Sequence, residues 1–505
     1  MVGYTALLPE GLLLATAVIV LLTGLFITQK KILGYITLVG LLASLVLVLK
    51  DWNLTAPFED APFYGAIVVD PFSQIFSAMF LVVGILVCIA ALKAYGEHQR
   101  QDEFYSLMLL AIVGMMVVAM SKDLVALFIG FELASISTYA MAGFDKRDPK
   151  SIEAALKYFL IGGLSSSMMV FGMSYIYGLT GTTNIDLIAA AFAADPALAT
   201  TPAILLAMVM LIAGFGFKMA FVPFHMWAPD TYEGAPSIVS ALLAAGSKKM
   251  GFAAAFRIFI VGLIAMKADW YIAFTILAVV TMTVGNILAV VQTSVKRMLA
   301  YSSIAHAGYI AIVFVIVAYY PDASAMAVTH AVTGGLMHAF SHALGKAGAF
   351  IAVAAVGYMI LSKDGKVDDP NHIDNYNGLG KRAPITAFLF ALLLCSLAGI
   401  PPLFGFTSKF VLFLASVEAG LLGLAIICVL NSALSVYYYA KVVMRMYWGE
   451  PGGEAFIESP TYLFALALAV IVLIALFAMP FATPGDSVYI WAETAAKAIL
   501  PALEV

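Results

Sequence analysis

Apolar runs of about 20 residues follow one another along almost the whole chain, and they constrain the fold more than any motif does. Hydrophobic residues make up 63% of the 505 residues and charged residues only 11%, a balance typical of proteins that cross a membrane many times. In hydrocarbon a spanning segment must satisfy its own backbone hydrogen bonds, and runs of this length do so as helices. The sequence therefore predicts an all-α polytopic membrane protein.

We expect about fourteen transmembrane helices, because about fourteen runs are long enough to cross the hydrocarbon core. Glu10 rather than a basic region lies at the start of the first run, so we read that run as a span and not as a signal peptide. The run 325–361 leaves room for a bend, and residues 485–505 read as a short amphipathic surface helix. The runs begin near Leu7, Lys31, Pro71, Glu103, Leu124, Ile152, Pro202, Ser237, Trp270, Met298, Ala325, Pro384, Leu421 and Tyr462.

Basic residues gather in alternate loops, which indicates how the chain is oriented in the membrane. The remaining loops include the acidic segment from Asp51 to Asp70 and the Lys/Arg-free segment from Gly181 to Thr201. This asymmetry predicts an even number of spans, with both termini on the outer side of a prokaryotic plasma membrane. The residues expected on the inner side are Lys30, Lys31, Lys93, Arg100, Lys146, Arg147, Lys150, Lys296, Arg297, Lys363, Lys366, Lys381, Arg382, Lys441 and Arg445.

Two of the runs are interrupted by proline and also carry a lysine. Pro223 breaks the run that holds Lys218, while Pro401 and Pro402 break a later run before Lys409. A broken membrane helix frees backbone polar groups, which persist only against protein or a water-filled cavity. Alternate threading gives the two runs opposite directions, which indicates two inverted repeats of five helices with sites near the midplane. The copies are not identical, since the lysine precedes the first break and follows the second.

The repeat pattern divides the chain into four parts. We expect residues 1–102 to form helices 1–3 and residues 103–265 to form the first antiporter-like repeat, helices 4–8. Residues 266–447 are then the second repeat, helices 9–13, and residues 448–505 hold the last helix and the amphipathic segment.

A carboxylate accompanies the first lysine. Glu132 lies nine residues after Asp123, which places it about 13 Å into the membrane at about 1.5 Å per residue. A lone carboxylate at that depth is either protonated or paired with a base. Lys218 is the expected partner, because it is the nearest buried cation in the same predicted repeat. The pair either opens and closes beside water or, as the structural alternative, ties two helices together.

The run after the first break carries Lys248, Lys249 and Arg257. Adjacent residues on a helix point about 100° apart, so only one of the two lysines faces a given path. We expect Lys248 on the path and Lys249 either at a neighbouring subunit or snorkelling to an interface. Arg257 is expected to be a structural anchor.

Histidines supply a second set of candidate proton carriers. His338, His342 and Lys346 recur at four-residue steps and share one helix face, and imidazole accepts and releases protons near neutral pH. His306, in another run, would bridge the two halves, and His225 just after the first break is a further candidate relay. A hydrogen-bonded structural role is the alternative for each histidine. The four-residue His spacing also suits a metal, but no third ligand lies nearby in the sequence.

The ionisable residues together predict a lateral polar axis along the midplane, because each one costs at least a few kcal/mol to insert. No basic run suggests nucleic acid, and no glycine-rich phosphate loop is found. The three cysteines (Cys88, Cys395 and Cys428) lie far apart and lack ligand spacing, so we expect no redox cofactor or metal in this chain. The residues of the predicted axis are Glu132, Lys218, Lys248, His306, His338, His342, Lys346 and Lys409.

Several strings closely resemble the antiporter-like N subunit of respiratory complex I and of the related archaeal F(420)H(2) dehydrogenases. They are FHMWAPDTYEGAPSIVSALLAAGSKKMGF, VKRMLAYSSIAHAGYI and GIPPLFGFTSKF, and the resemblance runs from about residue 70 to 448. GLMHAFSHALGKAGAF departs from many N subunits and is more like the M- and L-type paralogues. The long lateral C-terminal helix of L-type subunits is missing, which favours the N type.

The resemblance implies fourteen helices, two inverted five-helix repeats and proton translocation driven by electron transfer in partner subunits. Those partners are expected to hold the flavin and iron–sulfur clusters and to include K- and M-type neighbours and the lateral helix of an L-type subunit. The family's key residues map onto Glu132, Lys218, Lys248 and Lys409, and the choice of Lys248 follows the alignment of SKKMGF with the family pattern SKAAGF.

Three functions are consistent with these observations. The first is a non-redox, proton-pumping subunit of a quinone- or phenazine-reducing dehydrogenase, of the NADH:quinone or F(420)H(2) type. The second is an Mrp-like cation/proton antiporter subunit or a stand-alone secondary transporter, recognised by sodium-dependent transport without an electron donor. The third is a membrane scaffold, in which replacing the buried ionisable residues by leucine is neutral or stabilising.

Overall fold

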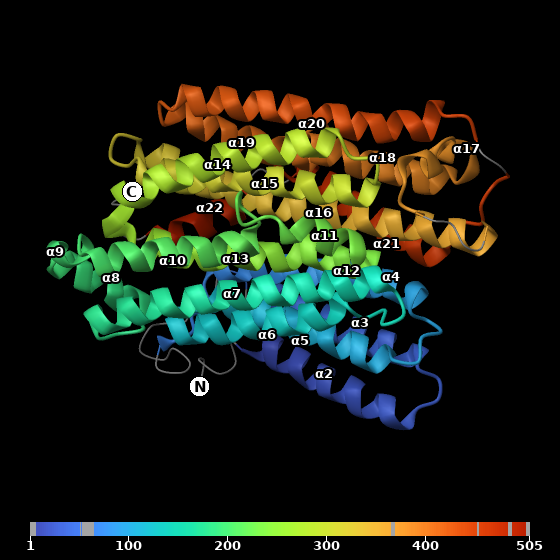
Figure 1. Cartoon of the computed structure of the whole chain (residues 1–505), viewed down its shortest axis with the longest axis horizontal. Coiled ribbons are helices and arrows are strands. Elements are labelled where there is room, and N and C mark those ends of the chain that lie inside the picture. The colour runs from blue at the N-terminus through green and yellow to red at the C-terminus, as the bar shows by residue number, and fades with distance from the viewer. Residues whose placement is uncertain are drawn as a thin grey trace.

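The computed structural model describes residues 7–50, 52, 65–364, 369–451, 454–482 and 487–500. Helices make up nearly all of these residues, and Figure 1 shows them side by side along the long axis of the molecule, with connections at the two ends. Within the described ranges, extended pairing is limited to isolated bridges such as those between residues 123 and 184 and between 294 and 372. The predicted all-α architecture is confirmed.

The first half of the chain contains three leading helices and then a group that ends in one long composite helix. The leading helices are α2 (Leu8–Phe26), α3 (Lys31–Lys50) and α4 (Pro71–Ala94). The next are α5 (Gln101–Met120), α6 (Leu124–Ala142), α7 (Pro149–Thr180), α8 (Ile185–Ala194), α9 (Pro196–Ala199), α10 (Pro202–Met219) and α11 (Trp227–Gly234). The composite helix comprises α12 (Ser237–Leu242), the π-helix η3 (Leu243–Ser247), α13 (Lys248–Ala255) and the π-helix η4 (Phe256–Gly262).

The second half also consists mainly of long helices, and its last helix is amphipathic. Its elements are η5 (Ile264–Met266), α14 (Lys267–Val290), α15 (Val295–Ala318), α16 (Ala325–Asp364), η6 (Ile373–Tyr376), α17 (Leu379–Arg382), α18 (Pro384–Ala398), α19 (Phe404–Glu418), α20 (Leu422–Trp448), α21 (Pro460–Ala482) and α22 (Val488–Ile499). α16 is one uninterrupted α-helix of 40 residues across the run 325–361. α22 packs its buried face against α4 and α16.

The predicted number of crossings agrees with the structure. Thirteen helical stretches in the described part of the chain are long and apolar enough to cross a membrane. The interrupted pair α18–α19, which is too short on either side of its break to be counted among them, completes the fourteen.

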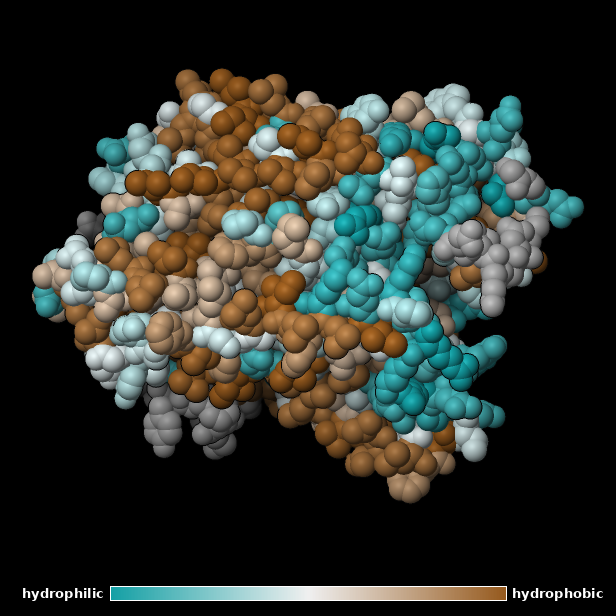
Figure 2. All heavy atoms as spheres, in the orientation of Figure 1, coloured by the Kyte–Doolittle hydropathy of each residue, from teal (hydrophilic) through white to brown (hydrophobic). Residues whose placement is uncertain are grey.

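Polar residues gather at one end of the bundle. Figure 2 shows hydrophilic residues at the end where α17 lies in Figure 1, while hydrophobic residues cover most of the remaining face. This distribution fits a bundle that stands across a membrane, with one end richer in charge. Most of the expected acidic loop, together with Lys363 and Lys366, lies outside the residues whose side chains are described.

The centre of the bundle is screened from lipid. The composite helix Ser237–Gly262 is 100% buried across its apolar window and α15 is 94% buried, whereas α7 and α14 are each 39% buried. Side chains on the composite helix and on α15 therefore contact protein and not hydrocarbon. Any charged side chain on them must find its polar partners within the chain.

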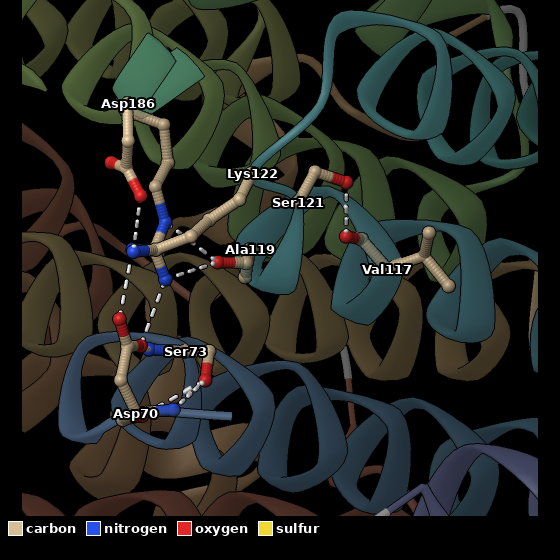
Figure 3. Close-up of polar contacts among 8 residues, drawn as sticks. Asp70, Ser73, Val117, Ala119, Ser121, Lys122 and Asp186 are labelled. Carbon is tan, nitrogen blue, oxygen red and sulfur yellow. Dashed lines mark hydrogen bonds and ion pairs between the residues drawn. The ribbon is translucent and has the colours of Figure 1, made fainter. Parts of the chain in front are cut away.

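A buried ion pair fixes the far end of the composite helix. Asp70 caps α4 by accepting a hydrogen bond from the Ser73 amide at 2.8 Å (Figure 3). Arg257 in η4 donates from two guanidinium nitrogens to the two oxygens of Asp70, both at 2.8 Å, and also to the Ala119 carbonyl at the end of α5. The anchoring role expected for Arg257 is confirmed, and it ties three helices together. Nearby, Lys122 pairs with Asp186 at 2.7 Å (Figure 3).

We expect Asp70→Asn to lower the free energy of unfolding by about 3–5 kcal/mol, because it leaves the Arg257 guanidinium buried without its carboxylate. The midpoint of thermal denaturation of the purified protein in detergent measures the effect. Arg100→Gln is the control, since its contact with Glu103 is 3.9 Å long and half exposed and contributes at most about 1 kcal/mol. Equal midpoints for the two variants would contradict the anchoring role.

Candidate functional site

The first predicted break is formed as the proline suggested. α10 ends with Ala220 in the left-handed conformation at φ 57°, where its amide donates to the Gly216 and Phe217 carbonyls. Pro223 follows three residues later and cannot continue a helix hydrogen-bond ladder. Lys218 sits in the last turn of α10 with 0% of its surface exposed.

The second break has the same construction. α18 ends with Gly399 at φ 86°, whose amide donates to the Cys395 and Ser396 carbonyls, and Pro402 follows three residues later. Lys409 on α19 reaches back across this break, and its Nζ donates to the carbonyls of Leu397 and Ala398, both at 3.0 Å. The ammonium therefore satisfies carbonyls that the helix end leaves without partners.

Lys218 lies among hydroxyls and aromatic rings. Its Nζ donates to Ser135 Oγ at 2.9 Å and to Tyr158 OH at 3.0 Å, and it lies 5.3 Å from the Phe131 ring centre. Trp227, the first residue of α11, stacks on the Tyr158 ring at 4.6 Å and donates to the Phe217 carbonyl. The WAPD string thus positions the phenol that receives the Lys218 hydrogen bond.

The expected ion pair between Glu132 and Lys218 is not formed. In the described part of the chain no carboxylate lies within 4.0 Å of Lys218, and Glu132 instead accepts a hydrogen bond from Ser166 Oγ at 2.5 Å. The direction of the Glu132 side chain around α6 therefore differs from the expectation. Glu132 is only partly buried and faces α7, whereas Ser135 on the next turn of α6 faces Lys218.

Acidic residues of α11 hold the second half of the broken helix in place. Asp230 accepts from Lys157 of α7 at 2.8 Å and from Arg297 of α15 at 2.9 Å, and Glu233 also accepts from Arg297 at 2.8 Å. These contacts join α11 to both neighbouring helices. The segment after the break beside Lys218 is therefore held to α7 and α15 by ion pairs.

Hydroxyl groups connect the Lys218 surroundings to the composite helix. Tyr158 OH lies 3.4 Å from Ser247 Oγ, at the end of η3, and the next residue is Lys248. Lys248 is 1% exposed, and its Nζ donates to Ser303 Oγ on α15 at 3.0 Å. The expected inward orientation of Lys248 agrees with this contact.

Lys346 reaches the same part of α15 from the other side. Its Nζ donates to the Leu299 carbonyl at 2.8 Å and to Ser302 Oγ. Ser302 and Ser303 are adjacent, so neighbouring hydroxyls on α15 accept hydrogen bonds from ammonium groups of α13 and α16.

Lys249 does not snorkel or face outward as expected. It is 0% exposed, and its Nζ lies 2.7 Å from Nδ1 of His342. The helical-wheel argument correctly separates the two lysines by about 100°. It fails because the composite helix is buried on all sides, so the second direction also leads to a polar partner on α16.

The histidines form a connected cluster. His306 Nδ1 lies 3.0 Å from His338 Nε2, and His338 Nδ1 lies 3.1 Å from Ser408 Oγ on α19. The rings of His306 and His342 have centres 4.5 Å apart, and Tyr439 OH of α20 lies 3.4 Å from His306 Nε2. His306 thus joins α16 to α20 within the second half. Among the residues that the structure places, its hydrogen bonds and ring contacts do not reach the first half, to which the sequence predicted a bridge.

The row ends at Lys409, which follows Ser408 and donates to Ser432 Oγ on α20 at 3.1 Å. His225 stays apart from the row: it lies within the first break, and its buried Nδ1 has no hydrogen-bond partner. His330, two turns before His338 on α16, contacts Glu418 Oε2 through its Nδ1 at 2.7 Å. The residues whose positions are described include no group of three or more His, Cys, Asp or Glu side chains suited to a metal ion.

Sequence reasoning missed the hydroxyls that connect the ionisable groups. Serine and tyrosine are common in membrane helices, so only their contacts distinguish these from ordinary packing residues. They are Ser135, Tyr158, Ser166, Ser247, Ser302, Ser303, Ser408, Ser432 and Tyr439.

Tyr158→Phe removes one of the two hydroxyls that bind the Lys218 ammonium while it keeps the ring stacked on Trp227. We expect a loss of about 1–3 kcal/mol in the free energy of unfolding, because a buried charged donor loses a partner. Thermal denaturation in detergent measures it. Tyr177→Phe, on the same helix and 54% exposed, is the matched control. A Tyr158→Phe variant as stable as this control would show that the phenol does not support Lys218.

Comparisons with known proteins agree in one family. Residues 121–435 match the family described as NADH:quinone oxidoreductase/Mrp antiporter, TM. The chain is 50% identical over 474 residues to the F(420)H(2) dehydrogenase subunit N of Methanosarcina mazei, covering 92% of this chain and 93% of the relative. It is 39% identical over 459 residues to the NADH-quinone oxidoreductase subunit N of Trichlorobacter lovleyi, covering 90% and 89%.

A solved structure agrees as well. A chain of respiratory complex I from Thermus thermophilus with bound aureothin superposes with a TM-score of 0.78 and 28% identity, over 95% of this chain and 100% of that one.

Proposed function

The chain belongs to the NADH:quinone oxidoreductase/Mrp antiporter membrane family, and we propose that it is the proton-translocating, antiporter-like subunit of a complex I-like dehydrogenase. One observation carries the proposal: a row of buried lysines, histidines and hydroxyls runs from Lys218 to Lys409, and its middle lies on the composite helix and α15, which are 100% and 94% buried. So many buried cations are costly to insert. A role in moving charge explains why they are present.

The chain is a non-redox part of its enzyme. Quinone or phenazine reduction takes place in partner subunits, which hold the flavin and iron–sulfur clusters, and this chain holds no cofactor. We place it in the plasma membrane of a prokaryote with both termini outside. Its neighbours are K- and M-type subunits and the lateral helix of an L-type subunit. Exposed apolar side chains along α7, such as Leu156, Phe159 and Leu160, suit contact with these neighbours or with lipid.

Glu132 acts as the switch for the first lysine. Bound to Ser166, its carboxylate leaves Lys218 without a counter-charge. Two opposite charges about 4 Å apart attract by about 4 kcal/mol at an effective dielectric of 20. A turn of Glu132 toward α10 therefore decides whether Lys218 keeps its proton or passes it on through Tyr158.

The groups beyond Lys218 pass the proton between donors and acceptors. A hydroxyl accepts and donates at the same time, whereas an ammonium only donates. The hydroxyls of Tyr158 and Ser247 therefore lead from Lys218 to the composite helix, where Lys248 is the next residue after Ser247. Imidazole both accepts and donates near neutral pH, so His338, between His306 and Ser408, continues the path toward Lys409.

We further propose that residues 103–265 and 266–447 are the two inverted repeats. Two close helix crossings support this division. A Cβ on Gly114 of α5 would lie 2.6 Å from the Ala134 nitrogen of α6, and a Cβ on Gly285 of α14 would lie 2.6 Å from the Ala305 nitrogen of α15. Both pairs are displaced by the same 171 positions (114 to 285 and 134 to 305).

The residues that cap the second helix of each proposed repeat are also 171 positions apart. Asp123 caps α6 and Ser294 caps α15, again 171 positions apart (123 to 294). Asp123 forms a bridge with Asn184 and Ser294 with His372, so both loops are held in the same way. Together with the two breaks of equal construction, these features support two copies of one five-helix unit.

Neutralising the switch tests the proposal. We expect Lys218→Met and Glu132→Gln each to lower the number of protons moved per electron, because each removes a charge from the pair that holds or releases the proton. Inverted membrane vesicles that contain the assembled complex are driven first with F(420)H(2), the donor named for the 50% identical relative, and then with NADH. Electron flow to an artificial acceptor is measured in parallel and should fall less.

The matched control is Lys497→Met, which removes a 58% exposed lysine of α22. It should leave the proton-to-electron ratio unchanged. Normal ratios in both Lys218→Met and Glu132→Gln would defeat the proposal. Sodium-dependent transport by the purified chain without an electron donor would instead identify a stand-alone transporter.

A further inference from the structure

Two neighbouring lysines on α13 point into two different polar networks. Lys248 donates to Ser303 Oγ at 3.0 Å and lies 5.6 Å from the Tyr232 ring centre. Lys249 contacts His342 Nδ1 at 2.7 Å. Both side chains are buried, at 1% and 0% exposure. Because one residue of helix turns the side chain by about 100°, both contacts exist in the same conformation of α13.

The helix geometry makes this arrangement possible. The π-helix η3 (Leu243–Ser247) ends just before the two lysines. A π turn holds one more residue than an α turn, so it rotates everything after it by about 100° relative to a regular helix. Without that extra residue, position 249 would not face α16. Single π turns inside α-helices are frequent at functional sites.

Neither ammonium has a counter-ion. Among the side chains that the structure describes, no carboxylate lies within 4.0 Å of Lys248 or Lys249. Arg257, which ties helices together, meets the carboxylate of Asp70. Lys249 meets an imidazole nitrogen instead, which is a group that can take its proton.

We propose that Lys249 is a second proton carrier on α13 and that it donates to Nδ1 of His342. The inference rests on the proposed function for the source and the destination of the proton. In this step the N–H bond at Lys249 Nζ breaks and an N–H bond forms at His342 Nδ1. Neutral amine and imidazolium replace ammonium and neutral imidazole, so the positive charge moves from α13 to α16.

His342 is placed to pass the charge on. Its Nε2 is buried and has no hydrogen-bond partner, and its ring centre lies 4.5 Å from that of His306. The imidazolium keeps the proton received at Nδ1 and releases the one on Nε2, which crosses an intervening water to Nε2 of His306. The Nδ1 proton of His306 moves to Nε2 of His338. His306 then continues to His338 and Ser408 through contacts of 3.0 and 3.1 Å.

Lys248 lacks such an acceptor. Its hydroxyl partner Ser303 adjoins Ser302, which already accepts from the Lys346 ammonium. That branch therefore leads from one cation toward another. Lys249 is the lysine of α13 that touches the histidine cluster directly, so its contact with His342 joins α13 to α16.

Three substitutions at one position test the inference in the assembled complex. Arginine keeps the positive charge but does not give up its proton in proteins, histidine keeps a transferable proton, and methionine keeps neither. We expect Lys249→Met and Lys249→Arg to lower the proton-to-electron ratio in vesicles to a similar degree, and Lys249→His to recover part of it. A purely structural cation predicts the reverse order, with arginine restoring the ratio and histidine not.

Lys267→Met is the control, since this partly buried lysine binds the Tyr320 carbonyl outside the row. Ratios are compared at equal rates of electron flow to the artificial acceptor, which corrects for assembly. If methionine prevents assembly, the arginine and histidine variants still decide the question. Normal ratios in all Lys249 variants, or full recovery by arginine, would overturn the inference. Lys218→Met in the same experiment separates the cases, because a normal ratio there defeats the proposed function itself.

Discussion

Every buried ammonium in this protein must be given polar partners by the chain, and the rest of the architecture follows from that constraint. Removing a lysine from water costs several kcal/mol even after relaxation. Two helices are broken, and at the second break exposed carbonyls receive the Lys409 ammonium. Elsewhere, hydroxyls of neighbouring helices receive the ammonium groups of Lys218, Lys248 and Lys346. The composite helix and α15 are correspondingly the most completely enclosed stretches of the bundle.

The two proposed repeats carry different side chains at equivalent positions of α6 and α15. If residues 103–265 and 266–447 are repeats displaced by 171 positions along α6 and α15, then Glu132 corresponds to Ser303 and Ser135 to His306. The first half then offers a carboxylate that changes partner, while the second offers a hydroxyl and an imidazole that accept and donate. We interpret the first half as the part that controls the charge and the second as the part that conducts it.

Hydropathy and proline predicted the fold well, because both act locally. Span lengths follow from the thickness of hydrocarbon, and Pro223 and Pro402, each three residues after the helix C-cap, prevent α10 and α18 from continuing. The direction of a side chain around its helix depends on which neighbours pack there, and that is not a local property. Glu132 therefore turned to Ser166 instead of Lys218, and Lys249 turned inward to His342.

Continuity of the row is the central claim, and where neighbouring groups of the row are not in direct contact the proton crosses through water. The most direct test is a structure of the assembled complex at a resolution that reveals ordered water. The account predicts density for water beside Nε2 of His342 and between the groups that join Lys218 to Lys409. Gaps filled by apolar side chains, with no water density along the row, would contradict it.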